Sequence, residues 1–213
     1  MFLCLSFCLM DYVLSHTTPQ HDYLRRLERA AHLHLLRPAM QSGHLQGSLL
    51  RMLTALIRPQ RVLEIGTFSG YATLSIASAL PTGGRIVTFE VNDEQEEFTR
   101  PWLEGSPWAD KVEFVIGDAL ELLPQRTETY QMAFIDGNKR DYAAYYDLVL
   151  PRIDAGGLLI FDNTLWSGRA ADPSYHDAQT LGIRAFNDRA ATDPRVETLI
   201  LPLRDGLTLL RKK

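Results

Sequence analysis

Five short apolar runs between residues 61 and 162 alternate with stretches of helical periodicity. The runs read RVLEI, RIVTFE, KVEFVI, MAFID and GLLIFD, and the helical stretches between them cover residues 70–80, 93–104, 118–123 and 139–150. Near-continuous apolar strands that alternate with helices are typical of a parallel sheet with helices on both faces. The alternation therefore predicts an α/β fold.

The two ends of the chain depart from this alternation. Residues 22–36 and 43–57 carry apolar residues at helical spacing, which predicts two amphipathic helices before the first strand. After a helix predicted near 177–191, the pair Asp205-Gly206 lies between two β-like runs and indicates a hairpin. We therefore expect a mostly parallel sheet of seven strands that closes with an antiparallel C-terminal hairpin.

Length and composition suit one globular domain. A chain of 213 residues can form a full core, and its hydrophobic share of 46% and charged share of 23% are ordinary for such a domain. We expect a single domain over residues 1–213, with an N-terminal helical segment at 1–57 and an α/β core at 58–213. The net charge of -4 argues against a broad basic surface for nucleic acid.

The first ten residues, MFLCLSFCLM, contain both cysteines, Cys4 and Cys8. No disulfide framework or cysteine-based zinc site can therefore span the core, and the six histidines match no zinc spacing either. The segment lacks a basic n-region and a cleavage site, and it is too short to span a bilayer. We interpret it as an upstream extension or a segment packed on a partner. No other stretch could cross a membrane, so we expect a cytoplasmic protein with no membrane attachment.

Acidic residues stand at or near the carboxyl ends of all five predicted parallel strands: Glu64, Glu90, Asp118, Asp136 and Asp162. In open α/β sheets, ligands bind beyond these ends, where the strand order reverses. Any one of these residues fits a loop, and Asp118, before ALELL, also fits a helix N-cap. As a set they predict a ligand site at this edge of the sheet.

The first strand runs into LEIGTFSGY, whose glycines Gly66 and Gly70 do not form the dinucleotide pattern G-x-G-x-x-G. A glycine at this turn lets the backbone approach a ligand at a helix start. Glu90 lies at the next strand end, where an acidic residue binds ribose hydroxyls in nucleotide folds. Because the carboxylates would repel a pyrophosphate, a mononucleoside with a cationic or amino-acid tail fits better than a dinucleotide.

Four stretches, VLEIGTFSGYATLSIASAL, GDALELL, FIDGNKRDY and GGLLIFDNTLWSG, resemble the catechol / caffeoyl-CoA O-methyltransferase family of class I S-adenosylmethionine enzymes, in its bacterial branch. The resemblance runs from about Met40 to the closing DGLTLLRKK. Its specific part is the D-x-x-K of Asp136 and Lys139 together with the pair Asp162-Asn163. It implies a Rossmann-like methyltransferase fold, S-adenosylmethionine as cofactor, and methyl transfer to a hydroxyl of a catechol-like small molecule.

The resemblance also implies cofactor contacts. Glu90 would bind both ribose hydroxyls, and Asp118 and Ala119 would flank the adenine. The methionine part would lie against Glu64, Gly66 and Thr67, with Ser69 and Tyr71 from the same turn. Met40 and Ser42 would lie beside the transferred methyl group, and Asp136 would contact both cofactor and metal. The sequence departs from the family at Ala72, where a serine often contacts the cofactor carboxylate.

In the same resemblance, Asp136, Asp162 and Asn163 would hold a divalent cation. Carboxylates, an amide oxygen and waters suit a hard cation, Mg²⁺ first, with Mn²⁺ or Ca²⁺ as alternatives. Such a cation binds both oxygens of a vicinal diol and lowers the hydroxyl pKa.

Lys139 would be the catalytic base. A nearby cation and partial burial would lower its pKa from the ordinary value of about 10.4. The other interpretation of Lys139 is a helix lysine paired with Asp136. Met40, Lys139 and Trp166 would face the substrate. Trp166 either forms a wall against a planar ring or packs on the core.

Two other functions stay open at this point. A tRNA hydroxyuridine O-methyltransferase of the same fold would need phosphate contacts, for which Arg169, Arg184 and Arg189 are available. A non-catalytic nucleoside-binding protein would have no use for the Asp136, Lys139, Asp162 and Asn163 set. The amphipathic helices before residue 60 offer more apolar surface than one added layer needs, so we also expect a homodimer.

Overall fold

The structure is a computed structural model that describes residues 7–213, with Phe7 and Cys8 described by their backbone alone. The interpretation of the first ten residues as an extension thus falls largely outside the described residues. The helices are α1 (Phe7–Ser15), α2 (Asp22–His34), α3 (Gly43–Ile57), α4 (Tyr71–Ala77), α5 (Glu96–Glu104), α6 (Ala119–Leu122), α7 (Tyr142–Val149) and α8 (Ala178–Thr192). Short 3-10 turns include η1 (Pro38–Met40), η2 (Asp93–Gln95), η3 (Ala109–Lys111), η4 (Leu123–Gln125), η5 (Lys139–Asp141), η6 (Leu150–Arg152) and η7 (Trp166–Ala171).

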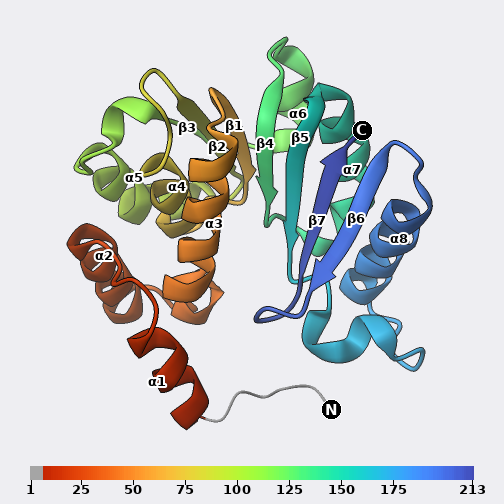
Figure 1. Cartoon of the computed structure of the whole chain (residues 1–213), viewed down its shortest axis with the longest axis horizontal. Coiled ribbons are helices and arrows are strands. Elements are labelled where there is room, and N and C mark those ends of the chain that lie inside the picture. The colour runs from red at the N-terminus through yellow and green to blue at the C-terminus, as the bar shows by residue number, and fades with distance from the viewer. Residues whose placement is uncertain (1–6) are drawn as a thin grey trace.

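Seven strands form one sheet in the order β3-β2-β1-β4-β5-β7-β6. They are β1 (Arg61–Ile65), β2 (Arg85–Glu90), β3 (Val112–Ile116), β4 (Tyr130–Ile135), β5 (Ile153–Asp162), β6 (Val196–Leu201) and β7 (Leu207–Lys212). β1 to β5 pair in parallel, whereas β7 pairs antiparallel with both β5 and β6. The predicted seven-stranded α/β sheet with an antiparallel C-terminal hairpin is confirmed (Figure 1).

Helices cover both faces of the sheet. On one face, Leu50 of α3 and Ile76 of α4 pack against Val62 and Phe134 in a buried apolar cluster. On the other face, α6, α7 and α8 contribute to a larger cluster that includes Phe186. The central strands are apolar on both faces because each face lies under a helical layer. This two-sided burial is why β1, β2 and β4 read as continuous apolar runs.

The strand order reverses between β1 and β4. The chain proceeds from β1 to β2 and β3 in one direction and, after α6, to β4 and β5 in the other. The carboxyl ends of β1 and β4 therefore part at a switch point, the usual place for a ligand in an open α/β sheet.

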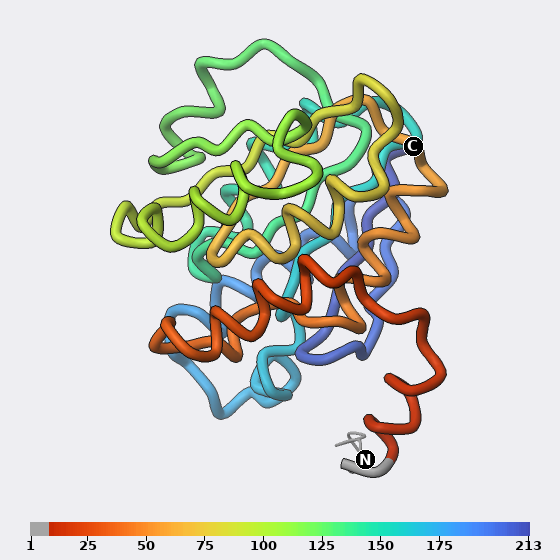
Figure 2. Tube along the Cα trace, turned by 90° about the vertical axis from the view of Figure 1, so that its left-hand side faces the viewer, coloured from red at the N-terminus to blue at the C-terminus, as the bar shows by residue number. Residues whose placement is uncertain are grey.

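The N-terminal helices lie on the α4 side of the sheet. Leu24 and Leu27 of α2 pack against Tyr71 and Leu74 of α4. In both views α1 lies beyond α2 at the periphery of the molecule (Figure 2). Within residues 7–213, no helix combines the length and apolar character that crossing a membrane requires.

Candidate active site

The backbones of β1 and β4 approach closely at the switch point. The amide of Asp136 donates to the carbonyl oxygen of Ile65 at 2.8 Å. Gly66 follows with φ of 97°, and a Cβ there would collide with the carbonyl oxygen of Asp136. Both the positive φ and the close approach require glycine at this position.

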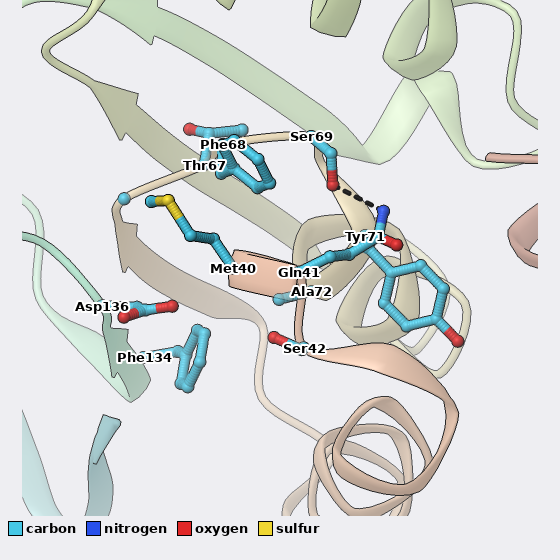
Figure 3. A pocket seen from close by; sticks show the side chains of 11 residues that line it. Met40, Gln41, Ser42, Thr67, Phe68, Ser69, Tyr71, Ala72, Phe134 and Asp136 are labelled. Atoms are coloured by element: carbon cyan, nitrogen blue, oxygen red, sulfur yellow. Dashed lines mark hydrogen bonds between the residues drawn. The ribbon is translucent and has the colours of Figure 1, made fainter. Parts of the chain in front are cut away.

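A small cavity opens at this point. It is lined by Met40, Gln41, Ser42, Gly66, Thr67, Phe68, Ser69, Tyr71, Ala72, Phe134 and Asp136. The structure thus brings seven of the predicted cofactor residues to one place, from the segment before α3, the turn after β1 and the end of β4. Figure 3 shows the Met40 side chain extending toward the space between Phe68 and Asp136, while the ring of Tyr71 turns away. The Tyr71 hydroxyl donates to Gln20, so this side chain has a structural partner of its own.

Glu90 lies beside this cavity and holds the turn after β1. Its carboxylate accepts hydrogen bonds from the backbone amides of Phe68, at 2.7 Å, and Asn92, at 2.9 Å. Asp118 accepts from the amide of Leu120 at 2.8 Å and N-caps α6. The alternative interpretation of Asp118 as a cap is therefore what the structure shows, and Asp118 and Ala119 are not among the cavity-lining residues.

Glu64 is a buried carboxyl group in the middle of this arrangement. One oxygen accepts from the Thr73 hydroxyl at 2.5 Å, and the other, Oε1, has no hydrogen-bond partner. Burial is the main reason that the pKa of Glu64 rises to about 8; nearby Asp136 and Glu90 raise it further, and the hydrogen bond from Thr73 acts against the rise. Glu64 lies two residues before Gly66, which lines the cavity, and its orphaned oxygen is a candidate acceptor for a ligand N–H group.

Asp136 directly follows β4, and Asp162 is the last residue of the neighbouring strand β5. Ile135 pairs with Phe161, so the two aspartates occupy equivalent positions one step beyond this pair. β4 and β5 are thus neighbours in the sheet. Asp162 accepts from the Gln46 side chain at 2.7 Å and from the amide of Asn163, also at 2.7 Å.

Lys139 is buried and makes two short contacts. Its Nζ lies 2.5 Å from Oδ1 of Asp136 and donates to the Tyr142 hydroxyl at 2.7 Å. The Tyr142 hydroxyl in turn donates to the carbonyl oxygen of Asp162 at 2.6 Å. Burial raises the pKa of Asp136 to about 6, Lys139 acts against this rise, and the charge of Asp162 adds to it. The pairing of Lys139 with Asp136, one of the two interpretations from the sequence, is present in this structure.

Trp166 lies away from the cavity-lining set. It packs, partly buried, against the apolar cluster under α7 and α8, and its indole nitrogen has no hydrogen-bond partner.

Two of the three arginines considered for phosphate contacts are engaged within the protein. Arg184 donates to the carbonyl oxygens of Arg169 and Ala170, and Arg189 pairs with Asp147 at 2.5 Å.

The sequence analysis missed several residues of the site. Gln41, Phe68 and Phe134 line the cavity, and Gln46 contacts Asp162 from α3. Phe68 could have been identified from its place between the two glycines. Gln41 and Gln46 lie outside the strand ends, where no periodic pattern or motif indicates a site residue.

Comparison with known proteins identifies the family. The sequence profile described as O-methyltransferase matches residues 14–213. The chain belongs to this O-methyltransferase family. Among its relatives, tricin synthase 1 from Oryza sativa subsp. japonica is 35% identical over 188 residues, which are 81% of this chain and 75% of the rice protein. Caffeoyl-CoA O-methyltransferase 2 from Eucalyptus globulus is 36% identical over 183 residues, 78% of this chain and 72% of that protein.

Solved structures of O-methyltransferases share the fold closely. TomG from Streptomyces achromogenes, in complex with SAM, has a TM-score of 0.88 and 32% identity, with 95% of both chains covered. The O-methyltransferase from Bacillus cereus, in complex with SAH, has a TM-score of 0.88 and 30% identity, with 97% of both chains covered. The chain is therefore an S-adenosylmethionine-dependent O-methyltransferase with a Rossmann-like fold. The non-catalytic nucleoside-binding alternative is not favoured.

Proposed function

We propose that this O-methyltransferase methylates one hydroxyl of a vicinal diol on a small aromatic molecule, assisted by a divalent cation at Asp136, Asp162 and Asn163. The observation that carries the proposal is the pairing of β4 with β5, which brings Asp136 and Asp162 to adjacent strand ends, with the buried Lys139 in contact with Asp136. Caffeoyl-CoA O-methyltransferases among the relatives are named for hydroxylated aromatic substrates.

The donor set fits a hard cation. Two adjacent carboxylates and the Asn163 amide offer oxygen ligands of the kind that Mg²⁺, Mn²⁺ or Ca²⁺ takes. In the described part of the chain, no group of three or more His, Cys, Asp or Glu side chains could hold a metal ion, so the amide and waters must complete the set. A bound cation would supply polarisation of both diol oxygens.

The residues in and around the cavity support S-adenosylmethionine as the ligand through their chemistry. Glu90, at the end of β2, is the carboxylate that would accept from the ribose hydroxyls. The methionine part would lie along the turn from Gly66 to Ser69, and Met40 and Ser42 would cover the methyl group. The negative charge of Asp136, which lines the cavity, favours a cationic ligand over an anionic one at this place.

Lys139 is the residue that we assign as the base. Its Nζ reaches the Asp136 carboxylate, so a diol oxygen held beside Asp136 would lie near it. The lysine must lose a proton before it can accept one, so activity should rise with pH.

A cytoplasmic location and a homodimer stay predictions from the sequence. The structure offers no specific support for a tRNA substrate.

The test is a methyl-transfer assay with labelled cofactor against a panel of catechols and bulk tRNA, with and without EDTA. Asp162→Ala should abolish most activity together with its EDTA sensitivity, because the diol is no longer oriented. Lys139→Ala should keep cofactor binding but lose about 10²- to 10⁴-fold in rate and the rise with pH.

Lys111→Ala is the matched control, because Lys111 is a partly buried lysine whose Nζ donates to the carbonyl oxygen of Leu80 and which lies before the amino end of β3, not at the carboxyl ends of the strands. It should leave the rate unchanged. Full turnover of Lys139→Ala with a catechol at neutral pH would show that this lysine is only the structural partner of Asp136. Activity that resists EDTA would contradict the cation assignment.

A further inference from the structure

Gln46 connects the N-terminal segment to the end of β5. It lies on α3, is fully buried, and donates through Nε2 to Oδ2 of Asp162 at 2.7 Å. The two residues are far apart in the chain but adjacent in the fold. An amide donor to a carboxylate restricts the directions in which that carboxylate can turn.

Arg204 fixes which way the Gln46 amide points. Its Nη1 donates to Oε1 of Gln46 at 3.0 Å. Because a guanidinium group only donates, it must face the amide oxygen, and the amide nitrogen then faces Asp162. Without this contact, the amide could present its oxygen to the carboxylate, which would be repulsive.

The same arginine holds the segment that carries Met40. Nη1 also donates to the carbonyl oxygen of Ser42 at 2.6 Å, and Nη2 donates to that of Ala39 at 3.2 Å. Arg204 lies between β6 and β7 with φ of 51°, a left-handed conformation that costs a non-glycine residue energy. The three contacts made by its side chain offset this cost and place the guanidinium over the start of α3.

We propose that Gln46 and Arg204 form a positioning relay that orients the Asp162 carboxylate and holds the Met40–Ser42 segment over the cofactor cavity. The inference rests on the proposed function of Asp162 as a cation ligand. Neither residue is a ligand itself. Residues that orient metal ligands typically contribute 10- to 100-fold to metal affinity.

The first measurement is Mn²⁺ binding to the cofactor-free protein, by calorimetry or electron paramagnetic resonance. Gln46→Met keeps the side-chain volume and removes both hydrogen bonds, so affinity should fall about 10- to 100-fold. Arg204→Gly removes the guanidinium without backbone strain, since glycine readily adopts a positive φ. This variant should lose less Mn²⁺ affinity than Gln46→Met. The double variant should bind Mn²⁺ no more weakly than Gln46→Met, because both act through one contact.

The second measurement is hydrogen exchange of residues 38–46, which should speed up in both single variants. Arg58→Gly is the matched control, because Arg58 also has a left-handed φ, of 54°, but lies at the other end of α3. It should change neither readout.

Mn²⁺ affinity within twofold of wild type in Gln46→Met, or additive losses in the double variant, would overturn the relay. If Gln46→Met does not fold, the Arg204→Gly variant decides the question. Wild-type Mn²⁺ affinity together with wild-type hydrogen exchange of residues 38–46 in that variant would overturn the relay. A wild-type protein that binds no Mn²⁺ would instead contradict the cation assignment, and the exchange measurement would still decide whether the relay holds the segment.

Discussion

Glu90 shows how a residue can serve fold and ligand together. Its two oxygens already accept hydrogen bonds from the backbone amides of Phe68, in the turn after β1, and of Asn92, two residues beyond the end of β2. A carboxylate oxygen has a second lone pair, so the same group can also accept from ribose hydroxyls. Glu90→Gln should weaken cofactor binding by about 1.5–3 kcal/mol, because charge-assisted hydrogen bonds are lost.

Isothermal calorimetry with S-adenosylhomocysteine measures this loss directly. Glu97→Gln, an exposed position in α5, is a suitable control and should bind like wild type. An unchanged affinity in Glu90→Gln would remove the ribose assignment.

The raised pKa of Glu64 predicts that the stability of the protein depends on pH. Its pKa of about 8 in the folded protein lies above the ordinary value of 4.5, so the folded state holds a proton that the unfolded state releases. The stability that this provides is complete below about pH 4.5 and is lost as pH rises towards 8. Relative to Glu64→Gln, the free energy of unfolding of the cofactor-free protein should fall by up to about 1.4 kcal/mol per pH unit in this window.

Chemical denaturation of both proteins at several pH values from 5 to 8 tests this prediction. Parallel stability curves for wild type and Glu64→Gln would mean that the carboxyl group does not change its protonation on folding. The comparison isolates Glu64, because Asp136, which also has a raised pKa, is present in both proteins.

At the scale of elements, Arg184 organises the loop between β5 and α8. It donates to four carbonyl oxygens in that loop, those of Arg169, Ala170, Asp172 and Tyr175. Arg184→Lys cannot make these four hydrogen bonds together, because the ammonium group is a compact point charge, whereas the guanidinium group carries several N–H donors in one plane. We expect a loss of about 1–3 kcal/mol in the free energy of unfolding and faster hydrogen exchange over residues 169–177.

Arg189→Lys, on the same helix, is the control. Arg189 pairs with Asp147 at the surface, where both side chains are about half exposed, so its replacement should cost at most about 1 kcal/mol. Equal effects of the two substitutions would show that the loop does not depend on Arg184.

The strands and most helices could be predicted from the sequence because their burial leaves a periodic pattern. The run MAFID becomes β4 with Asp136 directly after it, and the helix predicted near 177–191 is α8 at Ala178–Thr192. Boundaries shifted where local turns intervened: the helix predicted over 139–150 begins as η5, and α7 starts at Tyr142. The Asp205-Gly206 hairpin is present, although five residues rather than two connect β6 and β7.

The candidate site was predictable only in part, for a physical reason. Strand-end residues share an edge of the sheet by topology, so Asp136 and Asp162 could be paired before the structure was known. Gln46 and Arg204 meet through tertiary packing of segments 158 positions apart, and nothing in either segment indicates the contact. Lys139 could be placed near Asp136 by its spacing, but its hydrogen bond to Tyr142 could not.

At the scale of the whole molecule, exposed apolar side chains lie on the side of the sheet that α3 covers, both on α3 itself and on the edge strand β6. Met52 and Leu56 of α3 are 57% and 76% exposed, and Leu199 of β6 is 54% exposed. Alternation along β6 places Leu199 on the same face as Leu201, which packs in the cluster under α3. Moreover, β6 is an edge strand, and a long edge with apolar residues is a surface that proteins usually cover.

We therefore expect a homodimer that covers this face. Light scattering at micromolar concentration should give twice the chain mass of 24.1 kDa. Met52→Glu with Leu56→Glu should shift the mass to that of a monomer, because two buried carboxylates without partners would outweigh the apolar contact. Leu181→Glu on α8, at a position 46% exposed on the opposite side of the sheet, should leave the dimer intact. A monomeric wild type would contradict the homodimer, and a dimer that survives the α3 substitutions would place the interface elsewhere, with the edge of β6 as the next surface to test.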